Sequence, residues 1–561
     1  MILGLFGFAT PASATTYTWN PFLGGSGTDY GYGIAVDNIG NVYITGKSSA
    51  TWGSPLQAFS GGGSDAFVAK LNSAGNLIWN TFLGGGSYEI GYGIAVDTSG
   101  NVYVTGISGA TWGSPIVVPL GGNNYFLAKL DGTTGGLTWN TFLSSTSLPQ
   151  TTAVTLDTNG NIYVVGSTSS TWGSPILAYR QWSDGFVTKF DNNGNLLWNT
   201  FLGANTRMYH YGKGVAVDTS GNVYIVGYGN STSVWGTISR AYTANQDAWV
   251  VKLATSTGAV AWVAFLGGSG NDYGYGVTTD TSANVYVTGY SDATWGSPLQ
   301  LYNSSNDIFV AKLDSAGALT WNTFLGGAGS DGGTGIVLDA SSNIYISGNS
   351  TATWGSPTRL YTSGTDAFVA KLTSAGALVW NTFLGGSDTD SGNAIAVDIS
   401  GNVYAGGYST ITWETPIIPY TTSAQDAFAT KLSATTGALV TIVTSHTITA
   451  TSGTNGTISP TGATTVNDGD SQTFTLTPSA HYHVSDVLVD SISVGAVSSY
   501  TFTNVTTDHT ISATFAIDTF TVTASTVNSN GSITPAGTTT LNYGASQTYS
   551  ISANDPYPLP T

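Results

Sequence analysis

A motif of the form W-N-x-F-L recurs about every 60 residues, and this repetition constrains the fold more than any other feature of the chain. The motif begins at Trp19, Trp79, Trp139, Trp198, Trp321 and Trp380, and Trp262 opens a variant copy. Between copies lie two short apolar segments around a tight turn, a long loop with T-W-G-S-P, and a third segment such as Asp65–Leu71. Four short strands per unit, seven units and glycine-rich turns are typical of a β-propeller. We therefore predict an all-β fold in which residues 15–443 form a seven-bladed β-propeller with four-stranded blades.

Composition supports this class and excludes several functions. Charged residues make up only 8% of the chain and there are 74 glycines, which suits tight turns rather than amphipathic helices. The net charge of -18 argues against nucleic acid and anionic membranes as partners, because both require a basic face. The absence of cysteine excludes disulfides, thiol catalysis and cysteine metal sites. No dinucleotide or metalloprotease motif is present, so we predict no catalytic residues, no metal and no cofactor.

The repeat also resembles a known family. The run F-L-G-G-S-G-x-D-x-G-x-G-I-A-V-D-x-x-G-N-V-Y-V-T-G, followed by D-A-F-V-A-K-L, is similar to the SBBP-type β-propeller repeat of bacterial exported proteins. The resemblance covers about residues 17–443, and the third repeat departs from it at Ser144-Ser145. It implies a propeller and an exported protein, but it brings no activity and no catalytic residues.

The two ends of the chain are different in character. Residues 1–14 combine an apolar run with Ala12-Ser13-Ala14, which indicates the remnant of a secretory signal peptide; the alternative is an ordinary apolar first strand. From residue 444 a second repeat begins, with phrases such as Y-T-F-T-N-V-T that resemble the divergent internalin-type B repeat. We expect small β modules at 444–518 and 519–561, the second truncated, which the resemblance implies act as a stalk or spacer.

Strand order within a blade predicts where each loop lies. We expect G-I-A-V-D to be the innermost strand and W-N-x-F-L the outermost. Because adjacent strands are antiparallel, the T-W-G-S-P loop and the glycine-rich loop share one face, here called the top face, and the D-x-x-G-N turns lie on the bottom face. Long loops make the top face the expected binding face. We also predict that Trp19–Leu23 pairs with Ala427–Leu432 and closes the seventh blade.

One aspartate and one lysine recur in every repeat. A ring of calcium-binding or catalytic carboxylates is one interpretation. The alternative is a structural role, in which each aspartate accepts hydrogen bonds within its own turn. Because the first and third strands of a blade are parallel, we predict seven structural Asp–Lys ion pairs at the bottom face. The pairs are Asp37 with Lys70, Asp97 with Lys129, Asp157 with Lys189, Asp218 with Lys252, Asp280 with Lys312, Asp339 with Lys371, and Asp398 with Lys431.

Seven further tryptophans occupy the top-face loop, one in each repeat. Exposed, they would suit sugar stacking; buried, each would seal the joint between two blades, which is the interpretation we favour. They are Trp52, Trp112, Trp172, Trp235, Trp295, Trp354 and Trp413.

Irregular residues in the third and fourth repeats point to a specific site. By loop position we place all cations outside the repeat lysines at the top face: Lys47, Arg180, Arg207, Lys213, Arg240 and Arg359. Four of these gather with aromatic residues and a histidine, which suggests a site for an anionic or glycan ligand; drift in two degenerate repeats is the alternative. The candidate ligand-binding residues are Arg180, Trp182, Arg207, Tyr209, His210, Lys213 and Arg240. Binding should weaken with salt and strengthen below about pH 6.5 if His210 takes part.

These observations favour a secreted or cell-surface, non-catalytic binding or adhesion protein with an extracellular glycan or protein as partner and no membrane insertion. A structural surface-layer or matrix component is the alternative. A polysaccharide-active enzyme on a propeller scaffold ranks third.

Overall fold

The computed structural model describes residues 16–119, 122–144, 153–180, 182–203, 209–230, 235–421 and 424–554, with only the backbone at 144. The predicted signal-peptide remnant lies outside these residues. The described chain divides into two compact units, one formed by Thr18–Thr441 and the other mainly by the residues from Ile442 onward. Every regular element that the structure describes is a β-strand. No helix in this part of the chain is long and apolar enough to cross a bilayer.

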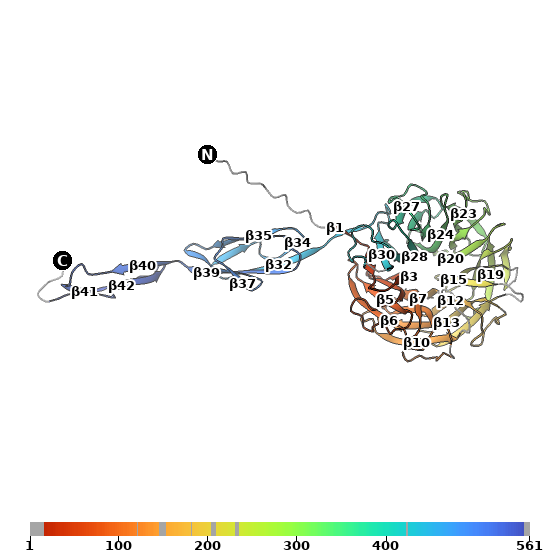
Figure 1. The fold of residues 1–561 in the computed structure, drawn as a ribbon, viewed down its shortest axis with the longest axis horizontal. Coiled ribbons are helices and arrows are strands. Elements are labelled where there is room, and N and C mark those ends of the chain that lie inside the picture. Colours follow the sequence, from red (N-terminus) through yellow and green to blue (C-terminus); the bar gives the residue numbers. More distant parts are fainter. Residues whose placement is uncertain are drawn as a thin grey trace. The chain divides into compact units, whose positions relative to one another are not determined.

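The first unit holds seven sheets whose innermost strands pack around a common centre (Figure 1). The innermost strands are β3 (Asp29–Val36), β7 (Glu89–Val96), β11 (Ala153–Leu156), β15 (His210–Val217), β20 (Asp272–Thr279), β24 (Asp331–Leu338) and β28 (Asp390–Val397). The second strands are β4 (Val42–Ser48), β8 (Val102–Ser108), β12 (Ile162–Thr168), β16 (Val223–Gly229), β21 (Val285–Ser291), β25 (Ile344–Ser350) and β29 (Val403–Ser409).

The third strands are β5 (Asp65–Leu71), β9 (Asn124–Leu130), β13 (Asp184–Phe190), β18 (Asp247–Leu253), β22 (Asp307–Leu313), β26 (Asp366–Leu372) and β30 (Asp426–Leu432). The outermost strands are β6 (Leu77–Leu83), β10 (Leu137–Ser144), β14 (Leu196–Leu202), β19 (Val260–Leu266), β23 (Leu319–Leu325), β27 (Leu378–Leu384) and β2 (Phe22–Leu23), and β17 (Thr237–Arg240) adds a fifth strand beside β19. The predicted all-β propeller with four-stranded blades is confirmed, and the described sheets are compatible with seven blades.

The predicted closure by the first strand is also confirmed. Phe22 pairs with Phe428 and Leu23 pairs with Ala427, and the Lys431 amide donates to the Trp19 carbonyl at 2.9 Å. The end of the propeller sequence contributes as well, because Leu439 forms a bridge with Leu432. The outermost strand of this sheet is therefore assembled from both ends of the unit. Just beyond it, β1 (Thr16–Thr18) pairs with β31 (Thr441–Val443).

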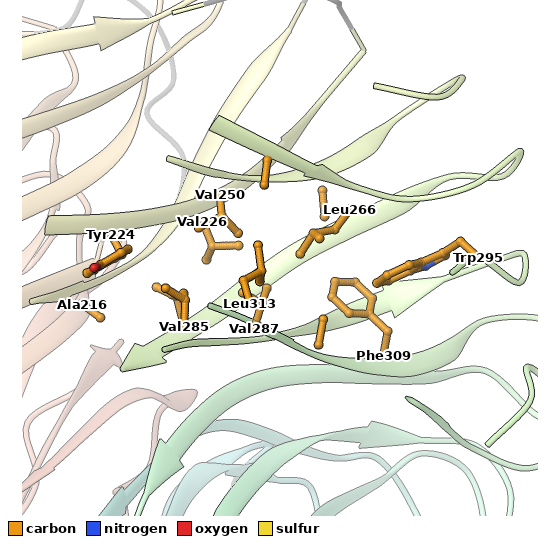
Figure 2. Packing of buried hydrophobic residues seen from close by; sticks show 14 of the residues in the cluster. Ala216, Tyr224, Val226, Val250, Leu266, Val285, Val287, Trp295, Phe309 and Leu313 are labelled. Atoms are coloured by element: carbon orange, nitrogen blue, oxygen red, sulfur yellow. The ribbon is translucent and has the colours of Figure 1, made fainter. Parts of the chain in front are cut away.

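Apolar side chains fill the space between neighbouring blades. Figure 2 shows one such cluster, in which Val226, Val250 and Leu266 of the fourth blade pack against Val287 and Phe309 of the fifth. The strands read as nearly continuous apolar segments because both faces of each sheet are covered by a neighbouring blade.

The outermost strand of each blade carries a tryptophan that lies on a glycine in the bottom turn of the next blade. A Cβ built on Gly376 would approach Trp321 to 3.0 Å, and the glycine has a φ of +86°, which disfavours any other residue. The same contact occurs at all seven junctions, pairing Trp19 with Gly75, Trp79 with Gly135, Trp139 with Gly194, Trp198 with Gly258, Trp262 with Gly317, Trp321 with Gly376 and Trp380 with Gly437. In most of them the indole N–H also donates to a carbonyl of that turn, as from Trp19 to Ser73 at 3.0 Å. These tryptophans join the blades.

The loop tryptophans were expected to seal the joints between blades, and their packing agrees with this. Apolar clusters that combine side chains of two neighbouring blades include Trp112, Trp295, Trp354 and Trp413. Most are buried, and six of the seven lie edge-on against two phenylalanines of their own blade, as Trp52 does against Phe67 and Phe82 at 5.4 and 6.0 Å. Trp235 instead lies edge-on against His210 and Trp249. Their burial also removes the interpretation of seven exposed sugar-stacking platforms.

The repeat Asp and Lys are linked mainly through a tyrosine rather than directly. An ion pair within 4.0 Å joins Lys189 to Asp157 and Lys312 to Asp280. In the other five blades, all of whose repeat residues are described, no such pair is present, so the prediction of seven direct ion pairs is wrong there. Instead, in every blade a buried tyrosine hydroxyl donates to the aspartate, and the lysine ammonium lies 4.9–5.4 Å from the same ring, at Tyr43, Tyr103, Tyr163, Tyr224, Tyr286, Tyr345 and Tyr404. The aspartate also accepts the amides of its own turn, as expected from turn chemistry.

The second unit contains two β modules. The first pairs β32 (Ser445–Ser452), β34 (Gly462–Asn467), β36 (Tyr482–Val489), β37 (Ile492–Gly495) and β39 (His509–Ile517) in one sheet and β33 (Gly456–Ser459), β35 (Gln472–Pro478) and β38 (Ser499–Phe502) in another. Ile448, Phe474 and Ile511 lie in its core. In the second module β40 (Thr519–Ala524) pairs with β42 (Gly537–Asn542), and β41 (Gly531–Thr534) pairs with β43 (Ser550–Ala553). The likeness to B repeats stays a prediction.

The tryptophan–glycine junction leads to a matched pair of substitutions. Gly376→Ala should lower the melting temperature clearly more than Gly401→Ala, because both glycines have positive φ but only Gly376 faces an indole, whereas nothing lies within 4 Å of the Cβ built on Gly401. We expect a difference of about 1–3 kcal/mol in the free energy of unfolding. Thermal unfolding followed by tryptophan fluorescence measures it, and equal losses in the two variants would contradict the role of the contact.

Candidate ligand site at the centre of the propeller

The innermost strands surround a cavity of about 400 Å³ on the propeller axis. Its lower part is apolar, with residues such as Ile34, Ile94 and Val277. Tyr32, Tyr92 and Tyr275 also line it, and Thr334 and Asn393 supply polar groups in the two blades between Tyr275 and Tyr32. A largely apolar and aromatic cavity with a few polar groups is the usual form of a small-ligand site.

Lys213 is the only charged residue among those described in the lining of this cavity. It lies in the innermost strand β15, where other blades carry Tyr32, Tyr92, Tyr275, Thr334 or Asn393. The structure therefore corrects its predicted place in a top-face loop. Its ammonium lies 5.9, 5.6 and 5.8 Å from the ring centres of Tyr211, Tyr228 and Tyr275. Burial lowers the pKa of Lys213 to about 8, and the three ring faces favour its charged form.

A path of aromatic rings leads from the top face to Lys213. Trp182, which is 45% exposed, lies 6.3 Å from Tyr209, which is 41% exposed. Tyr209 stacks parallel to Tyr211 at 6.1 Å, and Tyr211 lies 5.1 Å from Tyr228. Of the candidate residues, the structure thus brings Trp182, Tyr209 and Lys213 into one series of neighbouring side chains.

The structure does not place the remaining candidate residues in this series of side chains. Arg180 is exposed, and its backbone amide donates to Asp184 at 2.7 Å. Arg207 lies outside the described residues. His210 is fully buried with its ring edge-on to Trp235 at 5.0 Å, and burial lowers its pKa to about 4. The expectation that His210 binds ligand and strengthens binding below about pH 6.5 is therefore wrong, because the ring is inaccessible and stays neutral at that pH.

Arg240 is a structural residue rather than a ligand-binding one, which corrects its assignment. Its guanidinium donates to the carbonyls of Phe265 and Gly267 and lies 5.4 Å from the ring of Trp295 in the next blade. Arg359 makes the equivalent contacts two blades further on, with Phe383, Gly385 and Trp413. Two arginines in the same position bind the outer strand of one blade to the loop of the next.

Sequence reasoning missed the tyrosines of the central cavity. The signal was present in the innermost strand, where D-Y-G-Y-G alternates a large ring with glycine. Alternation places both tyrosines of the first blade on the same side of the strand, where Tyr32 lines the cavity and Tyr30 stacks on Tyr32 at 6.1 Å.

Comparison with solved structures gives propellers at low sequence identity. The hydrazine synthase of Kuenenia stuttgartiensis matches with a TM-score of 0.38 and 11% identity over 67% of this chain and 92% of its own. The Dos1 propeller gives 0.37 and 11%, covering 74% and 94%. A polysaccharide lyase of family PL25, an ulvan lyase, gives 0.42 and 10%, covering 76% and 97%.

Comparison by sequence identifies the repeat. An uncharacterized WD repeat-containing protein, L264 of Acanthamoeba polyphaga mimivirus, is 26% identical over 240 residues, which are 35% of this chain and only 17% of that protein. The family model described as SBBP, β-propeller repeat, matches residues 23–51, 78–111, 143–171, 201–233, 261–294 and 379–412. The chain therefore contains SBBP β-propeller repeats, as the sequence resemblance predicted.

The reassigned arginine can be tested against an exposed one. Arg240→Ala should lower the melting temperature by roughly 2–4 °C, because it removes two hydrogen bonds to buried carbonyls and the contact with Trp295. Arg180→Ala, at an exposed position, should leave the melting temperature nearly unchanged. A larger loss of melting temperature in Arg180→Ala than in Arg240→Ala would contradict the structural role of Arg240.

Proposed function

We propose that this chain is a secreted or cell-surface, non-catalytic binding protein whose propeller takes an acidic glycan at the top face and the central cavity. The single observation that carries the proposal is the position of Lys213 at the inner end of the aromatic path. The exposed rings of Trp182 and Tyr209 offer flat surfaces for sugar rings, and Lys213 offers one positive charge for a carboxylate or sulfate.

The asymmetry of the site supports one ligand rather than seven equivalent ones. Six of the seven innermost strands are described at the position of Lys213, and only one of them carries a cation there. The chain has a net charge of -18, so a lone cation in a cavity is the feature that can select an acidic group. A protein used only as a surface scaffold does not require a lysine at this position of the central cavity.

Two observations favour binding over catalysis. The described lining of the cavity contains no carboxylate that could act as a general acid or base beside Lys213. The acids with raised pKa lie elsewhere, buried between the blades beside the backbone of glycines such as Gly267. Export, adhesion and the role of the tail as a spacer belong to the same proposal and rest on the sequence patterns.

Direct binding measurements test the proposal. Calorimetry with oligosaccharides that carry uronate or sulfate groups should show binding, and neutral analogues of the same length should bind at least about tenfold more weakly, because a charged hydrogen bond contributes about 1.5–3 kcal/mol. Lys213→Met should lose this preference. Lys252→Met, the same change at the bottom face of the same blade, should keep it. Equal affinity of wild type and Lys213→Met for every acidic glycan would contradict the proposal.

The pH dependence follows from the lowered pKa of the lysine. Lys213 is charged below about pH 8 and neutral above it, so affinity for the acidic glycan should be constant from pH 6 to 7 and fall as pH rises beyond about 8. Titration calorimetry over this range measures it. An increase in affinity below pH 6.5 would instead point to a histidine.

A further inference from the structure

The first residue of five innermost strands is a buried acid that neither the repeat nor the proposed ligand site explains. These inner-strand acids are Asp29, Glu89, Asp272, Asp331 and Asp390, and each is at most 1% exposed. Each faces a second buried acid at the start of a third strand in the preceding blade, in the pairs Asp29 with Asp426, Glu89 with Asp65, Asp272 with Asp247, Asp331 with Asp307, and Asp390 with Asp366.

Glycine backbone holds the two carboxyl groups of a pair close together. A Cβ built on Gly267 would lie 2.5 Å from Asp272 Oδ2 and 2.7 Å from Asp247 Oδ1. Gly24, Gly84 and Gly326 occupy the same place in three other junctions. Two ionised carboxylates held this close together in a buried site would repel strongly.

A serine in the second strand lies between each inner-strand acid and a carbonyl oxygen. Ser108 Oγ lies 2.6 Å from the carbonyl oxygen of Ala110 and 2.9 Å from Glu89 Oε1. A hydroxyl has one proton, so it donates to the carbonyl or to the acid, and both contacts become hydrogen bonds only when the acid is protonated. Ser350 lies in the same way between Ala352 and Asp331, and the contact with a carbonyl recurs at Ser48, Ser291 and Ser409.

The position accepts neutral residues elsewhere in the ring. In β15 the first residue is His210, which is buried and neutral at pH 7 because burial lowers its pKa to about 4. At the start of the third strand in the second blade, Asn124 stands where the other blades carry aspartate. The corresponding first residue of the third blade lies outside the described residues.

We infer that the inner-strand acids are held as neutral carboxylic acids in the folded propeller. Proton uptake by these acids stabilises the contacts between neighbouring blades. The protonated acid can donate a hydrogen bond to the serine oxygen, and its neutral charge removes the repulsion between the paired acids. The ring is therefore more stable in mildly acidic surroundings than in alkaline ones.

The charges around these acids agree with this direction. Asp272 faces Asp247 and Asp292, and Arg240 is the cation nearby. Asp390 faces Asp366 and Arg359, and the other three face their paired acid, with Asp331 facing Asp307. Tyrosine hydroxyls also lie near four of these acids: Tyr88 near Glu89, Tyr273 near Asp272, Tyr361 near Asp331 and Tyr420 near Asp390. Burial raises the pKa of Asp272 to about 7 and those of Asp29 and Asp390 to about 6, and it raises those of Glu89 and Asp331 as well.

The sign of the effect follows from proton binding. Between about pH 4 and 7 the folded propeller holds protons that the unfolded chain has released, so stability falls as pH rises through this range. Below about pH 4 both states are protonated and the contribution is complete. His210 acts in the opposite direction between about pH 4 and 6.5, but it is one group against five.

Thermal unfolding at different pH values tests the inference. All 16 tryptophans precede residue 414, so tryptophan fluorescence of the full chain reports on the propeller and not on the tail. We expect the melting temperature at pH 5 to exceed that at pH 8 by at least about 5 °C. Asp272→Asn, which is neutral at every pH and can donate to Ser291, should raise the melting temperature at pH 8 and reduce the difference between the two pH values.

A matched control is Asp280→Asn in the same blade, where the aspartate accepts hydrogen bonds as an anion and its pKa is lowered. This change should lower the melting temperature at both pH values and leave the difference between them unchanged. Infrared spectra at pH 6 provide a second measurement: the C=O band of protonated carboxylic acids should be present in the wild type and weaker in Asp272→Asn. A melting temperature that is equal or higher at pH 8, or an unchanged infrared band in the variant, would overturn the inference.

Discussion

The contact between an outer-strand tryptophan and a glycine of the next blade is the interaction on which the ring depends. A Cβ built on any of these glycines would lie only 2.5–3.1 Å from an indole atom, so a larger residue would clash with the tryptophan. The positive φ of these glycines independently disfavours most other residues at the same positions. Because the contact is the same at every junction, including the one between Trp19 and Gly75 that joins the two ends of the propeller, the blades are related by a nearly constant step.

Regular blades leave the centre and the top face free to vary. The innermost strands need only backbone pairing and small residues such as Gly33 and Gly276 where neighbouring strands converge on the axis. Their inward side chains can therefore be tyrosine in some blades, threonine or asparagine in others, and lysine in one. The proposed ligand site is built from this permitted variation, whereas the bottom face repeats the same Asp, Tyr and Lys in every blade.

Much of the fold could be predicted from the sequence because each strand and turn is repeated. W-N-x-F-L at the edge and closure by Trp19–Leu23 followed from strand count and parity alone. The site was harder. Lys213 and Arg240 look alike in sequence, each a cation beside an aromatic residue, but one lies in a strand facing the axis and the other donates to two carbonyls of its own blade. The difference arises from side-chain direction and from contacts with the next blade, which no local pattern contains. The buried acid pairs were missed for the same reason, since their members are far apart in the chain.

The proposed role of Lys213 requires an accessible ammonium group in a cavity that receives an acidic glycan. Lysine acylation at pH 8, read by mass spectrometry residue by residue, tests it most directly, because only an amine that is reached by the reagent and partly neutral is labelled. We expect Lys213 to be labelled faster than Lys252, whose ammonium lies against Tyr224 at the bottom face, and we expect an acidic oligosaccharide to protect Lys213 while a neutral one does not. Equal labelling of Lys213 with and without every acidic oligosaccharide tested would contradict it.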